Sequence, residues 1–79
     1  MSTRVLLAED HAIVRAGLKA LLEKEGLSVV GEAADGREAL QLAQKLCPDV
    51  AVLDLAMPML NGIDAAVEIQ KSVPKVRTV

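Results

Sequence analysis

Two short apolar runs that end in acidic residues constrain the fold of this chain most. Residues 5–8 (VLLA) are followed by Glu9 and Asp10, and residues 50–53 (VAVL) are followed by Asp54. Continuous apolar runs of this length are typical of strands that are buried on both faces, as in a parallel sheet. The sequence therefore predicts buried parallel strands whose ends carry carboxylates.

Segments with a helical spacing of apolar residues alternate with the predicted strands. We predict strands at residues 4–8, 28–33, 50–54 and 76–79, and helices at residues 12–24, 36–46 and 62–72. Gly26 follows the first helix, Pro48 prevents extension of the second, and Asp35 with Glu38 matches a capping box. This alternation predicts one α/β domain over residues 1–79, with right-handed crossovers and helices on both faces of a parallel sheet.

Two finer expectations concern single elements. The third predicted helix carries Ile63, Ala66, Val67 and Gln70 on one face. Cys47, at the end of the second helix, is expected to be a small buried hydrophobe. Because it is the one cysteine of the chain, it can form no intrachain disulfide and no Cys-based metal site, which fits a reducing compartment.

The composition excludes several classes of function. The chain has 79 residues and no Phe, Tyr or Trp, so it lacks the rings on which single-stranded nucleic acids stack. Its net charge of -2 argues against a surface that binds phosphate backbones, and we predict no direct nucleic-acid binding. The apolar run near the N-terminus is too short for a signal sequence or a membrane span. We therefore expect a cytoplasmic protein that does not enter a membrane.

The acids at the strand ends form a candidate site. Ligands of open parallel sheets bind beyond the carboxyl ends of the strands. If the first and third strands are neighbours about 4.8 Å apart, the carboxylates of Glu9, Asp10 and Asp54 converge. Each close pair then repels by about 4 kcal/mol at an effective dielectric of about 20, and a hard cation such as Mg²⁺ would neutralise them. An aspartate beside such an ion can attack phosphorus as a nucleophile.

A structural interpretation of these acids stays open when spacing alone is considered. Acids at strand ends are common as helix N-caps, and Asp10 could cap the first helix. Asp35, Asp49 and Asp64 are interpreted in the same way, as cap or surface acids. Spacing by itself does not select phosphoryl transfer.

Three segments resemble a known family. Residues 49–62 (DVAVLDLAMPMLNG) are similar to the phosphorylation-site signature of response-regulator receiver domains of two-component systems. Residues 5–11 (VLLAEDH) and 34–40 (ADGREAL) extend the resemblance over nearly the whole chain. The segments 29–40 and 74–79 most resemble receivers whose output domain is a helix-turn-helix of LuxR or NarL type, so the parent protein is expected to be a transcriptional response regulator.

The resemblance implies an incomplete flavodoxin-like (receiver) fold, with the sheet order 2-1-3 and a partial fourth strand. Asp54 would accept a phosphoryl group from a sensor histidine kinase. Asp10 and Asp54 would bind Mg²⁺, Glu9 would act near it or through a water, and the backbone carbonyl of Ala56 would supply a further ligand. A residue such as His11, just after the acidic pair, can touch the site entrance in this family. A histidine in the first turn of a helix is more often a solvated surface residue, however.

The sequence also departs from the family pattern. A complete receiver has a fourth strand ending in a switch Ser or Thr and a fifth ending in Lys, and the sequence given stops at Val79 before either position. We therefore expect a truncated module with doubtful switching activity, and no enzymatic activity beyond phosphorylation and dephosphorylation of its own Asp54. We also expect a homodimer formed through an exposed sheet edge or apolar face. A non-signalling dimerising scaffold is the alternative, whereas a related phosphatase is disfavoured because Ala56 stands where its second acid is required.

Overall fold

A computed structural model of the chain describes residues 3–54, 62–73 and 75–78. The elements follow one another as β1 (Arg4–Ala8), α1 (Ala12–Lys24), β2 (Ser28–Ala33), α2 (Gly36–Leu46), β3 (Val50–Leu53), α3 (Gly62–Ser72) and β4 (Arg77–Thr78). The strands form one parallel sheet in the order β2-β1-β3-β4. The predicted α/β class and the predicted strand order, with a short fourth strand, are both confirmed.

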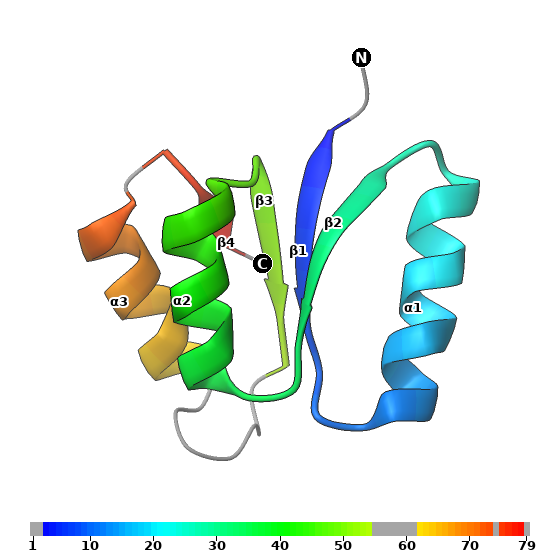
Figure 1. The fold of residues 1–79 in the computed structure, drawn as a ribbon, viewed down its shortest axis with the longest axis horizontal. Helices are drawn as coiled ribbons and strands as arrows, with labels where there is room; N and C mark the ends of the chain where they lie inside the picture. The colour runs from blue at the N-terminus through cyan, green and yellow to red at the C-terminus, as the bar shows by residue number, and fades with distance from the viewer. Residues whose placement is uncertain (1–2, 55–61, 74, 79) are drawn as a thin grey trace.

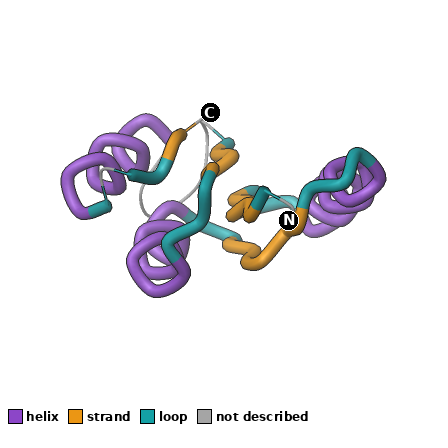
Figure 2. The backbone as a smooth tube through the Cα atoms, turned by 90° about the horizontal axis from the view of Figure 1, so that it is seen from above, coloured by secondary structure: helices purple, strands orange, loops and turns teal. Residues whose placement is uncertain are grey.

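The helices cover the two faces of the sheet unequally. Helix α1 lies alone on one face, whereas α2 and α3 lie together on the other (Figure 1). Seen from above, the strands lie between the single helix and the pair (Figure 2). Helices α2 and α3 pack against each other, and no residue of α1 is fully buried. The predicted placement of helices on both faces is confirmed, and the two clusters of buried apolar residues lie on the side of α2 and α3.

Strand β1 is the centre of the sheet, and its residues 5–8 are all buried. Leu6 packs in a cluster with Ala43 of α2 and Ile69 of α3, and Ala8 packs with Ala39 of α2. Because side chains alternate between the faces of a strand, Val5 and Leu7 face α1. The continuous apolar run therefore corresponds to a strand covered on both sides.

Helix α2 begins with the capping box that the sequence predicts. Oδ1 of Asp35 accepts a hydrogen bond from the backbone N–H of Glu38 at 2.8 Å. Oε1 of Glu38 accepts one from the backbone N–H of Ala34 at 2.7 Å. The first bond satisfies a donor of the first helical turn. The second pairs Glu38 with the residue before the N-cap, whereas in the usual capping box the N–H of the N-cap itself is the donor. The two bonds fix the start of α2 beside the carboxyl end of β2.

The prediction that Cys47 is buried is wrong. Its side chain is exposed, and its backbone adopts a left-handed conformation with a φ of 45°. The chain reverses direction here as α2 ends, and Pro48 enters the interior in place of Cys47. The position of a cysteine after the last apolar residue of a helix therefore does not indicate burial.

The face that α3 buries differs from the stripe identified in the sequence. Ile63 and Val67 are 61% and 48% exposed, whereas Ala65 and Ile69 are fully buried. Apolar residues occur on almost every side of this helix, so their spacing alone does not determine which side meets the sheet. Ile69 does so because it reaches the cluster around Leu6 of β1.

Two strand ends also differ from the predicted ranges. Strand β3 ends at Leu53, one residue before Asp54. Val76 lies before β4 because its N–H donates to the carbonyl of Val73 at 3.0 Å, which closes a turn. Val79, the predicted end of the last strand, lies outside the described residues.

The difference in burial between Ile69 and Ile63 of α3 predicts that the same substitution at the two positions will change the stability of the chain differently. Ile69→Val should lower the free energy of unfolding by about 1 kcal/mol, because it removes a methylene from a closely packed cluster. Ile63→Val, the matched change at an exposed position of the same helix, should have almost no effect. Urea unfolding followed by circular dichroism measures both, since the chain contains no Trp or Tyr for fluorescence. Equal losses in the two variants would contradict the assigned face.

Candidate functional site

The carboxyl ends of β1 and β3 bring four polar side chains together. One ligand atom from each of Glu9, Asp10, His11 and Asp54 lies within 4.8 Å of the others. The strands are direct neighbours, with Ala8 paired to Leu53, so the residues that follow them enter the same volume. The three acids predicted from the sequence therefore do converge. Ala56, the predicted backbone ligand, lies outside the described residues.

Backbone hydrogen bonds hold the acids at the end of the sheet. The N–H of Asp54 donates to the carbonyl of Ala8 at 3.0 Å, and the N–H of Glu9 donates to the carbonyl of Ala33 at 3.0 Å. The sheet bonding thus continues one residue beyond β1 and β3. Glu9 is 7% exposed, so it is a buried acid in this position. The backbone fixes like charges close together, which costs free energy unless a cation is present.

Asp10 does not cap α1. The N-cap of this helix is His11, whose side chain makes no capping hydrogen bond. Oδ1 of Asp10 is buried and accepts no hydrogen bond from the described residues, although His11 Nδ1 lies 3.0 Å away. The capping interpretation therefore does not account for the position of Asp10, whose carboxylate lies beside the ring of His11.

His11 belongs to the site although the sequence analysis did not place it among the ligands. Its side chain is 72% exposed, and its Nδ1 forms a hydrogen bond with Oε1 of Glu9 at 2.8 Å. The hydrogen bond with Glu9, followed by the negative charges of Asp10 and Glu9, raises the pKa of His11 above its usual 6.5. The histidine is therefore both solvated and in contact with the acids. The sequence feature that could have indicated this contact is the position of His11 directly after Glu9 and Asp10.

Arg15 connects the site to the rest of α1. Its Nη1 donates to the carbonyl of Glu9 at 2.8 Å, and its Nε lies 3.4 Å from Oε1 of Glu32 on β2. Nζ of Lys19 lies 3.3 Å from the other carboxylate oxygen of Glu32. These interactions hold α1 across β1 and β2. Sequence reasoning missed them because Glu32 is distant in the chain from both basic residues.

The remaining acids considered in the sequence analysis lie away from the cluster. Asp35 caps α2, and Asp64 is exposed in the first turn of α3. Asp49 accepts a hydrogen bond at Oδ2 from the backbone N–H of Arg4 at 2.8 Å, at the opposite end of β1. Their interpretation as cap or surface acids agrees with these positions.

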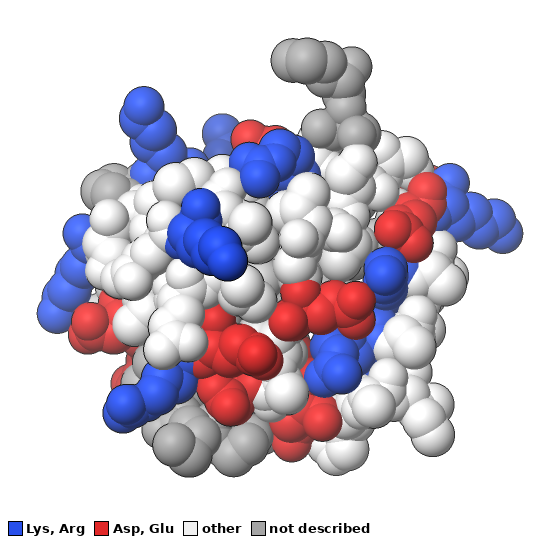
Figure 3. Space-filling view, viewed as in Figure 1, with Lys and Arg blue, Asp and Glu red and all other residues white. Residues whose placement is uncertain are grey.

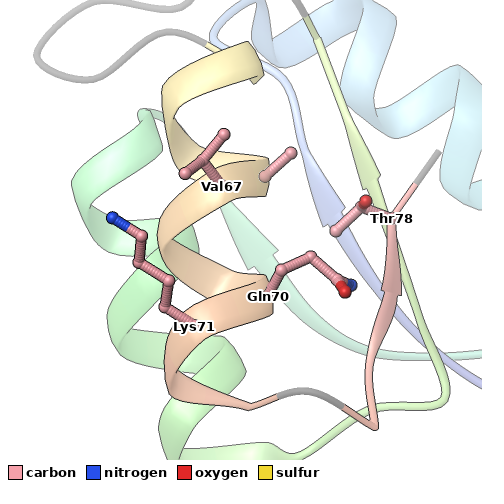
Figure 4. Close-up of a pocket in the computed structure, with 5 residues that line it drawn as sticks. Val67, Gln70, Lys71 and Thr78 are labelled. Atoms are coloured by element: carbon pink, nitrogen blue, oxygen red, sulfur yellow. The ribbon is translucent and has the colours of Figure 1, made fainter.

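A hollow of about 390 Å³ lies elsewhere, between α3 and β4. Its lining is formed by Ala66, Val67, Gln70, Lys71 and Thr78 (Figure 4). The side chain of Gln70 reaches across towards β4, and its Nε2 donates to the carbonyl of Val76 at 2.7 Å. Among the described residues, no carboxylate or imidazole lines this hollow. The acidic cluster therefore remains the better candidate for a site that binds a cation or carries out chemistry.

The contact between His11 and Glu9 predicts a dependence on pH. Because the pKa of His11 is raised above 6.5, the contact stabilises the fold fully below about pH 6.5, and this contribution is lost as pH rises through the raised pKa. Glu9→Gln should lower that pKa, since it removes the principal cause of the shift. NMR titration of the imidazole protons in EDTA measures both values. An ordinary or lowered pKa in the unmodified chain would contradict the geometry.

Comparisons with known proteins agree with this architecture. The model of the response regulator receiver domain family matches residues 5–79. The transcriptional regulatory protein PdtaR of Mycobacterium tuberculosis is 52% identical over 66 residues, which cover 84% of this chain and 32% of PdtaR. Among solved structures, a LuxR-family two-component response regulator from Aurantimonas sp. SI85-9A1 has a TM-score of 0.93 at 39% identity, covering 99% of this chain and 56% of that chain.

A second solved structure is a CheX–CheY–BeF₃–Mg²⁺ complex from Borrelia burgdorferi. Its TM-score is 0.91 at 27% identity, and the match covers 96% of this chain and 58% of that chain. The chain therefore spans about a third of the length of PdtaR and somewhat more than half of these solved chains. The likeness to a LuxR-family regulator confirms the subfamily that the sequence resembles. From the matched residues and the shared fold, the chain belongs to the response regulator receiver domain family.

Proposed function

We propose that this chain is a phosphoacceptor module of two-component signalling, in which Asp54 receives a phosphoryl group from a sensor histidine kinase. The observation that carries the proposal is the convergence of Glu9, Asp10 and Asp54 within 4.8 Å at the carboxyl ends of β1 and β3. Receiver domains are in general signalling modules and not enzymes. The carboxylate of Asp54 would form a bond to phosphorus as the bond to the kinase histidine breaks.

Mg²⁺ is the proposed cofactor, and the described residues fit it. The acids offer hard oxygen ligands, and Oδ1 of Asp10 is buried and accepts no hydrogen bond from the described residues, although Nδ1 of His11 lies 3.0 Å away. We assign Asp10 and Asp54 as ligands, with Glu9 nearby and the carbonyl of Ala56 as a further proposed ligand. When bound, the ion would offset the charge of the carboxylates and of the phosphoryl oxygens. Arg15 holds the backbone of Glu9, and thereby the position of the acidic pair.

The parent protein is proposed to be a cytoplasmic transcriptional response regulator. PdtaR is a transcriptional regulatory protein, and the Aurantimonas protein belongs to the LuxR family. On the face shown in Figure 3, Lys and Arg are dispersed among acidic residues and form no continuous basic surface. The whole chain has a net charge of -2, so we assign direct DNA contact to another part of the parent protein. None of the described helices combines the length and apolar character that crossing a bilayer requires.

A second copy of the chain is the second proposed partner, and it carries the alternative function of a dimerising scaffold. The observation that favours it is the solvent-facing side of α1, where Ile13, Val14 and Leu21 are 89%, 48% and 62% exposed. Large apolar side chains grouped on one helix are typical of association surfaces. In a symmetric dimer the same surface of both copies would be buried. We therefore place the proposed dimer interface on α1 in preference to the sheet edges.

The phosphoacceptor proposal predicts a covalent product at Asp54. Incubation with acetyl phosphate and Mg²⁺ should add one phosphoryl group, and Asp54→Asn or EDTA should abolish the addition. Asp35→Asn is the matched control, because Asn also caps helices well and Asp35 lies at the same end of the sheet. Intact-mass spectrometry measures the product. Addition that persists in Asp54→Asn, or that is absent from a folded unmodified chain, would refute the proposal.

The dimer proposal predicts a change in mass from one substitution. Sedimentation velocity at micromolar concentration should give a dimer for the unmodified chain and a monomer for Leu21→Asp, because a charge on the buried interface is costly. Val67→Asp places the same charge at an exposed position of α3, on the opposite side of the sheet, and should remain dimeric. A monomer mass for the unmodified chain would rule the dimer out.

A further inference from the structure

His11 adds a nitrogen atom to a site whose proposed function uses oxygen ligands alone. Its Nδ1 lies 2.8 Å from Oε1 of Glu9 and 3.0 Å from Oδ1 of Asp10. With the carboxylate of Asp54, these atoms form a group of four that lies within 4.8 Å. Three carboxylates and one imidazole make a mixed donor set.

The donors already lie in direct contact, because Nδ1 of His11 is hydrogen-bonded to Oε1 of Glu9 at 2.8 Å and lies 3.0 Å from Oδ1 of Asp10. Adjacent ligands of a tetrahedral zinc ion with bonds of about 2.1 Å lie about 3.4 Å apart. A zinc ion would therefore replace the proton between these atoms and move them apart by about 0.5 Å. The imidazole is 72% exposed, so small rotations of its side chain meet little resistance from packing.

The backbone fixes where His11 stands. Its N–H donates to Oε1 of Glu9 at 3.1 Å, and its carbonyl accepts from the N–H of Arg15 at 2.8 Å, at the start of α1. The imidazole itself makes no capping bond to that helix. Helix formation therefore requires residue 11 to begin the turn but does not require an imidazole there.

We propose that His11 is an additional metal ligand, which lets this pocket bind Zn²⁺ in competition with Mg²⁺. The inference rests on the proposed Mg²⁺ site and extends it. Mg²⁺ prefers oxygen ligands alone, whereas imidazole favours zinc and its neighbours in the first transition series. Asp10 and Asp54 therefore serve both ions, and His11 adds affinity for zinc alone.

The test compares the binding of ZnCl₂ and MgCl₂ in a Cys47→Ser background, with and without His11→Gln. Cys47 is replaced because its thiolate could bind zinc elsewhere; it lies near Arg4, at the opposite end of β1. His11 is the one histidine of the chain, so its imidazole ¹⁵N signals report ligation directly. Isothermal titration calorimetry at one fixed, mildly alkaline pH gives the affinities, and circular dichroism verifies that each variant is folded.

The expected result is a loss of zinc affinity of at least about tenfold in His11→Gln, with magnesium affinity within about twofold of the parent. The Nδ1 signal of His11 should shift on addition of zinc and stay unchanged on addition of magnesium. Unchanged zinc affinity, or tighter binding of both ions without His11, would overturn the inference and leave the magnesium site standing. Failure of the parent to bind either ion would overturn the inference together with the proposed function.

Discussion

The parallel pairing of β1 with β3 is the constraint on which the rest of this structure depends. It places the residues after Ala8 and after Leu53 at the same end of neighbouring strands, and the bond from the N–H of Asp54 to the carbonyl of Ala8 extends the pairing to the acid itself. The backbone positions that carry these carboxylates cannot separate without breaking hydrogen bonds of the sheet. Their repulsion is therefore retained, and a cation or a positively charged side chain relieves it.

Burial on the two faces of the sheet explains how the remaining elements serve this arrangement. Helices α2 and α3 enclose a dry cluster around Leu6, which fixes β1 and β3 relative to each other. Helix α1 covers the other face, with Arg15 bonded to Glu9 and near Glu32, and it leaves Ile13 and Leu21 exposed. The site lies at the carboxyl end of the sheet, and its residues from Glu9 to His11 lead from β1 into α1.

The sequence was sufficient for the architecture and for the acids of the site. The apolar runs that end at Glu9 and Asp54 predict buried strands, because this pattern is local to each strand. They also predict converging carboxylates, because neighbouring parallel strands end at the same edge of a sheet. The buried side of α3 could not be predicted, since apolar residues occur around that helix and Ile69 is selected by its distant contact with Leu6. The contact of His11 with Glu9 depends on how the chain turns into α1, which residue type alone does not specify.

The acidic cluster is proposed to form a working phosphoryl site around Asp54. Fluorine NMR of the chain with beryllium fluoride tests it directly, because beryllofluoride imitates a phosphoryl group bound to a carboxylate. We predict protein-bound fluorine signals that require Mg²⁺ and disappear in Asp54→Asn. Absence of bound signals from a chain shown to be folded, or signals that persist in Asp54→Asn, would contradict the account.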